Sequence, residues 1–180
     1  MNSVVVDSRT FEFPDGWLVM KYDATPYYKV KFQGKTKGAR GLKPEMAAVD
    51  LVATNPNERE PTMYLIESKD YRVNRRNKPI SPDEEFIRKV LDTLTGIIPS
   101  ALCSSSFLHG EKILREQLKK ARKLRLVYHF EQPARHSKLF PRPFDPADLQ
   151  SQIRAELRVI DPHALVLDNT MPRKVAWSVR

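Results

Sequence analysis

The strongest constraint on the fold is a pair of apolar runs that lie close together and contain acidic residues. The first run, residues 46–53 (MAAVDLVA), is interrupted by Asp50, and the second, residues 62–69 (TMYLIESK), ends in Glu67, Ser68 and Lys69. A turn-like segment at residues 54–61 (TNPNEREP) separates them. This pattern predicts two neighbouring antiparallel strands, so the fold contains a β-sheet.

The other patterns predict strands early in the chain and helices later. Ser81 and Pro82 resemble a capped helix start, and apolar residues recur at helical spacing from there to about residue 99. Further strands are expected at residues 17–22, 27–32, 124–130, 164–167 and 175–179, and further helices at residues 107–123 and after Asp145. The prediction is an α/β fold, a mixed β-sheet flanked by helices, forming a single domain over residues 1–180.

The chain is basic, and the excess of positive charge is concentrated in one stretch. Its 31 Lys and Arg residues against 22 Asp and Glu residues give a net charge of +9. Residues 111–142 contain ten basic and three acidic residues, a local net charge of +7. Such clustering favours an anionic partner, most often nucleic acid. The alternative is a solvated helix face in a basic protein.

Several classes of protein are not expected from this composition. The single cysteine, Cys103, cannot form an intramolecular disulfide, which favours a reducing cytoplasm. No apolar run approaches the roughly 20 residues that span a bilayer, so we expect no membrane partner. The first residues lack the pattern of a secretory signal. The four histidines have no paired ligand spacing, so we expect no zinc site.

The acids in the two apolar runs need a compensating charge. Aspartate is disfavoured in strands, and an unpaired carboxylate near a core is costly. Glu67 and Lys69 are two residues apart and therefore point to the same face of their strand. If the strand that contains Asp50 is its neighbour, the three side chains converge. Carboxylate and carbonyl oxygens are ligands suited to Mg²⁺, so the pattern predicts a site for phosphodiester hydrolysis. The alternative is a strand-end ion pair.

Asp50, a spacer of 16 residues and the tripeptide Glu67-Ser68-Lys69 resemble the signature of the PD-(D/E)xK nuclease superfamily, and in particular its small bacterial members. The resemblance covers residues 46–98 and implies a restriction-endonuclease-like fold. It implies that Asp50, Glu67 and the backbone carbonyl of Ser68 hold Mg²⁺ or Mn²⁺, and that Lys69 is the catalytic lysine. The chain departs from the signature at Val49, where proline is usual.

A further acid often completes the site in this superfamily. Glu12, Asp23 and Glu45 are the candidates, and the proximity of Glu45 to the predicted strand containing Asp50 favours Glu45 as an additional metal ligand.

The resemblance and the charge together predict a magnesium-dependent deoxyribonuclease. We expect it to act on DNA within a DNA-processing or anti-phage defence system, with specificity supplied by loops, a homodimer or a partner protein. The alternatives are an RNase and a catalytically silent nucleic-acid-binding subunit. The basic residues expected to contact nucleic acid are Arg72, Arg75, Arg76, Lys78, Lys89, Lys119, Lys120, Arg122 and Lys123. For these residues the alternative is a solvated loop, or helix-terminal cations that favour the helix dipole.

Overall fold

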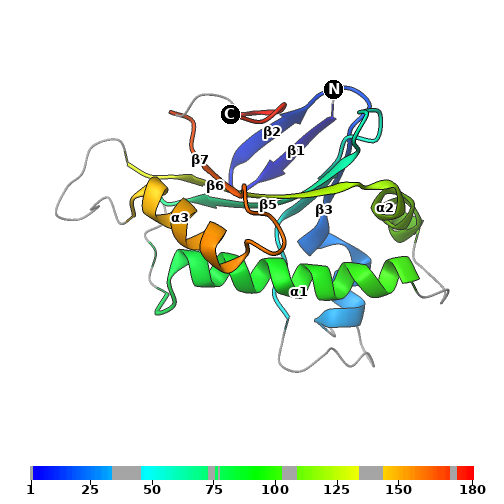
Figure 1. Cartoon of the computed structure of the whole chain (residues 1–180), viewed down its shortest axis with the longest axis horizontal. Coiled ribbons are helices and arrows are strands. Elements are labelled where there is room, and N and C mark those ends of the chain that lie inside the picture. The colour runs from blue at the N-terminus through cyan, green and yellow to red at the C-terminus, as the bar shows by residue number, and fades with distance from the viewer. Residues whose placement is uncertain are drawn as a thin grey trace.

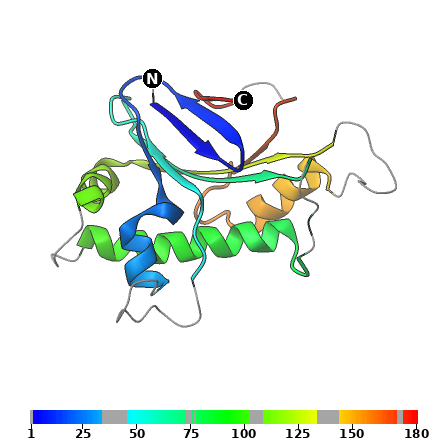
Figure 2. The ribbon, with the colours of Figure 1, turned by 180° about the vertical axis from the view of Figure 1, so that it is seen from behind.

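A computed structural model describes residues 2–33, 46–72, 76, 78–102, 109–133, 144–170 and 174–180. In these ranges the protein has three layers. A mixed sheet with the strand order β3-β4-β5-β6-β7 forms the middle layer. Figures 1 and 2 show α1 and α3 on one side of this sheet, and strands β1 and β2 of a smaller sheet on the other. The smaller sheet has the order β1-β2-β8.

The described strands are β1 (Asn2–Val6), β2 (Arg9–Phe13), β3 (Leu18–Lys21), β4 (Leu51–Thr54), β5 (Thr62–Asp70), β6 (Lys123–Glu131), β7 (Leu165–Leu167) and β8 (Ser178–Val179). The described helices are α1 (Pro82–Leu102), α2 (His109–Lys120) and α3 (Pro146–Glu156), with two short helical segments, η1 (Tyr22–Ala24) and η2 (Tyr28–Phe32). None of the helices in these ranges is long and apolar enough to cross a membrane.

Strand β5 lies in the centre of the larger sheet. It pairs antiparallel with β4, where Leu51 lies opposite Ile66, and parallel with β6, where Glu67 lies opposite Tyr128. Side chains of a strand alternate between its two faces. Met63 and Leu65 therefore pack in the core beside the helices, whereas Ile66 packs in the core beside the smaller sheet. By the same alternation, Glu67 and Lys69 are on the helix side.

The predicted α/β class, a mixed sheet flanked by helices, is confirmed. The predicted antiparallel pairing of residues 46–53 with residues 62–69 is also correct, although β4 begins only at Leu51. The predicted starts of α1 and α3 are both correct. Pro82 is the first residue of α1, and the Asp145 side chain caps α3 by accepting from the Ala147 amide at 2.7 Å.

The prediction of a strand at residues 27–32 is wrong, because this segment forms the helical turn η2. Tyr28 and Phe32 are four residues apart, a spacing that fits one face of a strand and one face of a helix equally well. The Gln33 amide donates to the Tyr28 carbonyl at 3.2 Å, and both aromatic rings are buried in the core beside α1. The hairpin β1-β2 was not among the predicted strands.

Asp161 ties the segment after α3 to the central sheet. Its carboxylate is 2 % exposed and accepts from the Leu126 amide at 2.9 Å, the Arg125 guanidinium at 2.8 Å and the His163 amide at 3.0 Å. We expect Asp161→Ala to lower the free energy of unfolding by about 2–4 kcal/mol, because buried donors lose their acceptor. Urea denaturation measures this change. Glu156→Ala, at an exposed acid, should change stability by less than about 0.5 kcal/mol. Equal losses of stability in Asp161→Ala and Glu156→Ala would contradict the role of Asp161 in holding this segment to the sheet.

Candidate functional site

The pairing of β4 with β5 brings together the three predicted catalytic residues, Asp50, Glu67 and Lys69. Asp50 immediately precedes β4, and its Oδ2 accepts a hydrogen bond of 2.8 Å from the Ser68 amide on β5. Lys69 Nζ lies 2.6 Å from Glu67 Oε1 on the same strand. The Asp50 carboxylate, just before β4, therefore lies beside the strand that carries Glu67.

Helix α1 adds a second ammonium group to this cluster. Lys89 Nζ lies 2.5 Å from Glu67 Oε1 and 4.0 Å from Asp50 Oδ1. Lys89 was predicted to contact nucleic acid, and the structure brings it against the two acids. Glu67 is only 1 % exposed, so both lysines compensate a carboxylate that is almost completely removed from water.

The surroundings of Glu67 change its proton affinity. Burial raises the pKa of Glu67 to about 7; Asp50 adds to this rise, and Lys89 and Lys69 oppose it. Burial by itself would lower the pKa of Lys69, but the charges of Glu67 and Asp50 raise it above its usual range. Lys69 is therefore a protonated hydrogen-bond donor, whereas action as the base would need a depressed pKa.

Helix α1 also fixes the backbone that leads into Asp50. The Ala47 amide donates to Asp92 Oδ2 at 2.8 Å, and the Val49 amide donates to Thr93 Oγ1 at 3.0 Å. Residues 46–49 run without regular structure, so these bonds replace the ladder of a strand. Asp92 and Thr93 thus hold Asp50 next to β5.

A buried arginine supports the same strand from the opposite face. Arg9 of β2 is 1 % exposed, and its guanidinium donates to Ser68 Oγ and to the His129 carbonyl, the latter at 3.4 Å. Arg9 also lies 3.7 Å from Glu131 Oε1, which lies 3.1 Å from His129 Nε2. Sequence reasoning missed Arg9. The only available signal was a basic residue between the β-prone runs of the N-terminal hairpin.

Of the two candidates for a further acid that the structure describes, Asp23 lies nearer to the site than Glu12. Burial raises the pKa of Asp23, and the charge of Asp50 raises it further, which places the two carboxylates in electrostatic contact. Asp23 follows β3 in η1, and the Tyr22 amide donates to the Asp50 carbonyl at 2.9 Å. Glu12 is bonded instead to Ser178 in the smaller sheet. Glu45, the favoured candidate, lies outside the described residues.

The carboxylate oxygens of Asp50 and Glu67 are of the kind that bind a hard divalent cation. Glu67 Oε2 is buried and has no hydrogen-bond partner among the described residues, and Asp50 Oδ1 lies on the side of Lys89. Within the same ranges, no three His, Cys, Asp or Glu side chains form a metal-binding group. Mg²⁺ commonly takes one or two carboxylates and completes its octahedron with waters and substrate phosphates. Asp50 and Glu67 would supply the two carboxylates of that mode of binding.

Three of the predicted nucleic-acid contacts are paired with acids of the chain itself. Arg72 donates to both oxygens of Asp70, at 2.9 and 2.6 Å. Arg76 is nearly buried and lies 2.5 Å from Glu85 Oε2, and Lys78 pairs with Oε1 of the same carboxylate. Arg75 lies outside the described residues.

The remaining predicted contacts form an exposed basic cluster at the other end of the sheet. Lys123 lies opposite Thr62 in the β5–β6 pairing. Thr62 is five positions before Glu67, a separation of about 17 Å along the strand. Lys123 also pairs with Glu60. The cluster comprises Lys119, Lys120, Arg122 and Lys123.

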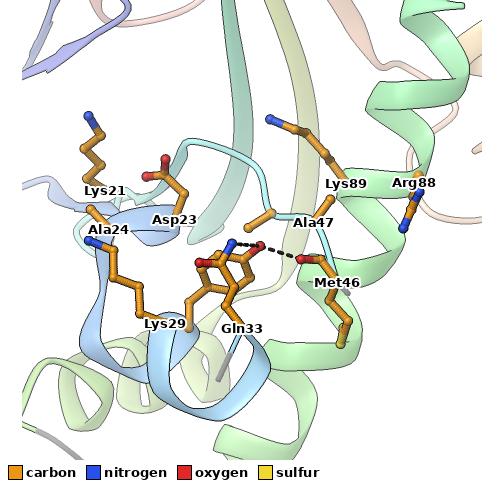
Figure 3. Close-up of a pocket in the computed structure, with 11 residues that line it drawn as sticks. Lys21, Asp23, Ala24, Lys29, Gln33, Met46, Ala47, Arg88 and Lys89 are labelled. Carbon is orange, nitrogen blue, oxygen red and sulfur yellow. Dashed lines mark hydrogen bonds between the residues drawn. The ribbon is translucent and has the colours of Figure 1, made fainter. Parts of the chain in front are cut away.

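An open pocket of about 680 Å³ lies beside the carboxylates. Lys89 and Asp23 belong to its lining, whereas Asp50, Glu67 and Lys69 do not, so the pocket adjoins the cluster of acids through Lys89 and Asp23. Figure 3 shows Lys21 and Lys29 on one side of this pocket, with Lys89 and Met46 on the other. Neither Lys21 nor Lys29 was predicted as a site residue, because the pocket depends on the helical turn η2, which the sequence pattern did not indicate.

Comparisons with known proteins give one relative. No family model matches the chain, and no solved structure matches it. The chain is 28% identical over 172 residues to a cysteine–tRNA ligase of Neisseria meningitidis serogroup A / serotype 4A (strain DSM 15465 / Z2491). The similarity covers 83% of this chain and 24% of that protein, so the chain spans about a quarter of the relative's length.

The Arg76–Glu85 pair gives a prediction for stability as a function of pH. Although burial opposes ionisation, hydrogen bonds from Lys78 and Arg76 lower the pKa of Glu85 below its usual 4.5. The pair therefore stabilises the fold above about pH 4.5, and this stabilisation is lost as the pH falls through the lowered pKa. We expect Glu85→Gln to lower the free energy of unfolding at pH 7 by about 2 kcal/mol.

Urea denaturation at several pH values checks this expectation. The difference between wild type and Glu85→Gln should shrink as the solution becomes more acidic than about pH 4.5. Glu84→Gln, at the exposed neighbouring position, is the matched control and should have little effect. A difference that is constant with pH would show that lost packing, and not charge, causes the change.

Proposed function

We propose that the protein is a metal-dependent nuclease that hydrolyses phosphodiester bonds of DNA. The observation that carries the proposal is that Asp50, just before β4, meets Glu67 of β5. Lys69 and Lys89 lie against Glu67, and Lys89 also lines an open pocket. Two acids, a nearby ammonium group and access for a polyanion are what such hydrolysis requires. The unpaired Glu67 Oε2 supports a role in binding a cation.

The order of the elements also supports the proposal. A strand preceded by Asp50, an antiparallel strand carrying Glu67-Ser68-Lys69, the helices α1 and α2, and then a strand parallel to the second follow one another along the chain. This order is in keeping with the resemblance of residues 46–98 to the PD-(D/E)xK nucleases. A small nuclease module of this kind suits a DNA-processing or anti-phage system with partner subunits, by analogy of fold.

The residues of the chain have distinct parts in the proposed reaction. Asp50 and Glu67, with the Ser68 carbonyl, would hold the cation. When bound, Mg²⁺ polarises the scissile phosphate and lowers the pKa of a coordinated water. Lys69 donates hydrogen bonds that orient the attacking water or neutralise charge on a phosphate oxygen. Lys89 compensates the buried charge of Glu67 and would contact a phosphate oxygen from α1. Asp23 adds a negative charge next to Asp50.

Two other functions remain as alternatives. A catalytically silent nucleic-acid-binding subunit would share the fold, and metal-dependent cleavage separates it from a nuclease. An RNase is the other alternative, and the name of the Neisseria relative, a tRNA ligase, is a reason to include tRNA among the substrates tested. That similarity covers a quarter of the relative, so its ligase activity is not carried over.

Cleavage assays test the proposal directly. Supercoiled plasmid, linear duplex, single-stranded DNA and tRNA are incubated with the protein in Mg²⁺, Mn²⁺ or EDTA. We expect cleavage of DNA that requires the metal and falls by about 100-fold or more in Lys69→Ala, because an oriented donor is lost. Lys112→Ala, at an exposed lysine of α2, is the matched control. Activity in EDTA, or equal activity in Lys69→Ala and wild type, would overturn the proposed site.

Binding of the metal has a separate readout in thermal stability. We expect Mg²⁺ and Mn²⁺ to raise the Tm of the wild type, since a ligand that binds only the folded state stabilises it by mass action. Asp50→Asn should abolish this rise, and Asp23→Asn should reduce it. Scanning fluorimetry at matched ionic strength gives the measurement, with Asp148→Asn as an exposed acidic control. A rise that persists in Asp50→Asn would place the metal elsewhere.

A further inference from the structure

The pocket beside the two carboxylates has walls that come from different parts of the chain. The end of β3 supplies Lys21, the segment that follows it supplies Asp23 and Lys29, and α1 supplies Arg88 and Lys89. Its volume of about 680 Å³ lies within the usual range of ligand sites, about 300–1,000 Å³. The pocket is therefore large enough for a ligand of the size of a nucleotide unit.

Positive charge dominates the lining. Among the described residues of the lining, four side chains are cationic, those of Lys21, Lys29, Arg88 and Lys89, and Asp23 is the one carboxylate. Lys21 and Lys29 are exposed, and Lys21 Nζ donates only to a backbone carbonyl, that of Val5 at 3.3 Å, in the described part of the chain. Arg88 reaches Asp92 at 3.7 Å while 56 % of its side chain remains exposed. The pocket therefore suits an anion.

The pocket and the carboxylate cluster share residues. Lys89 lines the pocket and lies 2.5 Å from Glu67 Oε1. Asp23 also lines the pocket, and its side chain interacts electrostatically with Asp50. Asp23 Oδ1 is buried and has no hydrogen-bond partner among the residues described. An anion held by Lys21 and Lys29 thus lies across the pocket from Lys89, which contacts Glu67.

We propose that this pocket binds the phosphate backbone of the nucleic acid next to the scissile bond, through Lys21, Lys29 and Arg88. Lysine ammonium groups act as point charges, which suits contacts to phosphates without regard to base sequence. The inference rests on the proposed nuclease function and adds the path of the substrate strand. It also replaces the exposed cluster at Lys119–Lys123, about 17 Å along the sheet from Glu67, as the main binding surface.

Fluorescence anisotropy in EDTA measures binding without cleavage. Labelled single-stranded and duplex DNA are titrated with wild type, with Lys21→Gln/Lys29→Gln and with the charge-matched control Lys112→Gln/Lys174→Gln, in which both lysines are exposed. We expect the pocket variant to raise Kd by about tenfold or more and to reduce the slope of log K against log salt by about 1.5, as two lost phosphate contacts require. The control should change Kd by less than about twofold.

The other outcomes separate this inference from the proposed function. Wild type that cleaves DNA, together with a pocket variant that binds as well as wild type, overturns the pocket alone. Equal losses in the pocket variant and the control also overturn it, because they would report total charge. Binding lost only in Lys119→Gln/Lys120→Gln would assign the surface to the exposed cluster. Wild type that neither binds nor cleaves nucleic acid overturns both proposals.

Discussion

The carboxylate of Glu67 is almost completely buried. The arrangement of charged side chains around it follows from this burial. A buried negative charge must be met by positive charge or by hydrogen bonds. Lys69 provides one ammonium group from the same strand, and Lys89 provides another from α1. Helix α1 therefore has to lie across this face of the sheet. The same helix, through Asp92 and Thr93, holds the backbone that delivers Asp50 to the neighbouring position.

Much of the fold could be predicted from local patterns. The strands β4 and β5 have apolar runs, and α1 and α3 have caps and helical spacing, so periodicity and turn signals were sufficient. The pattern failed at η2, where Tyr28 and Phe32 satisfy both periods and only their packing beside α1 selects the helical turn. The layered arrangement of two sheets depends on long-range pairing, such as that of β2 with the C-terminal strand β8, which no local pattern encodes.

The site was predictable where it lies on regular strands. Asp50, Glu67 and Lys69 converge as the alternation of side chains requires. The basic residues near the acids were not predictable in the same way. Lysines and arginines that are close together in the sequence need not lie beside the acids in the folded protein. Lys119 and its neighbours are far along the sheet, whereas Lys21 and Lys29 come from separate positions and meet α1 only after folding. Arg9 reaches β5 from the opposite face, through contacts that no spacing in the sequence reveals.

Through Arg9, the β1–β2 hairpin helps to hold the central strand β5 in place. The Arg9 guanidinium touches Ser68, the residue between Glu67 and Lys69, and it also provides the positive charge beside the buried carboxylate of Glu131. Displacing β2 would leave Glu131 without this cation. It would also remove the contact of Arg9 with the face of β5 opposite to Glu67 and Lys69. The geometry of the two acids is thus braced from both surfaces of the sheet, by an arginine on one and a helix on the other.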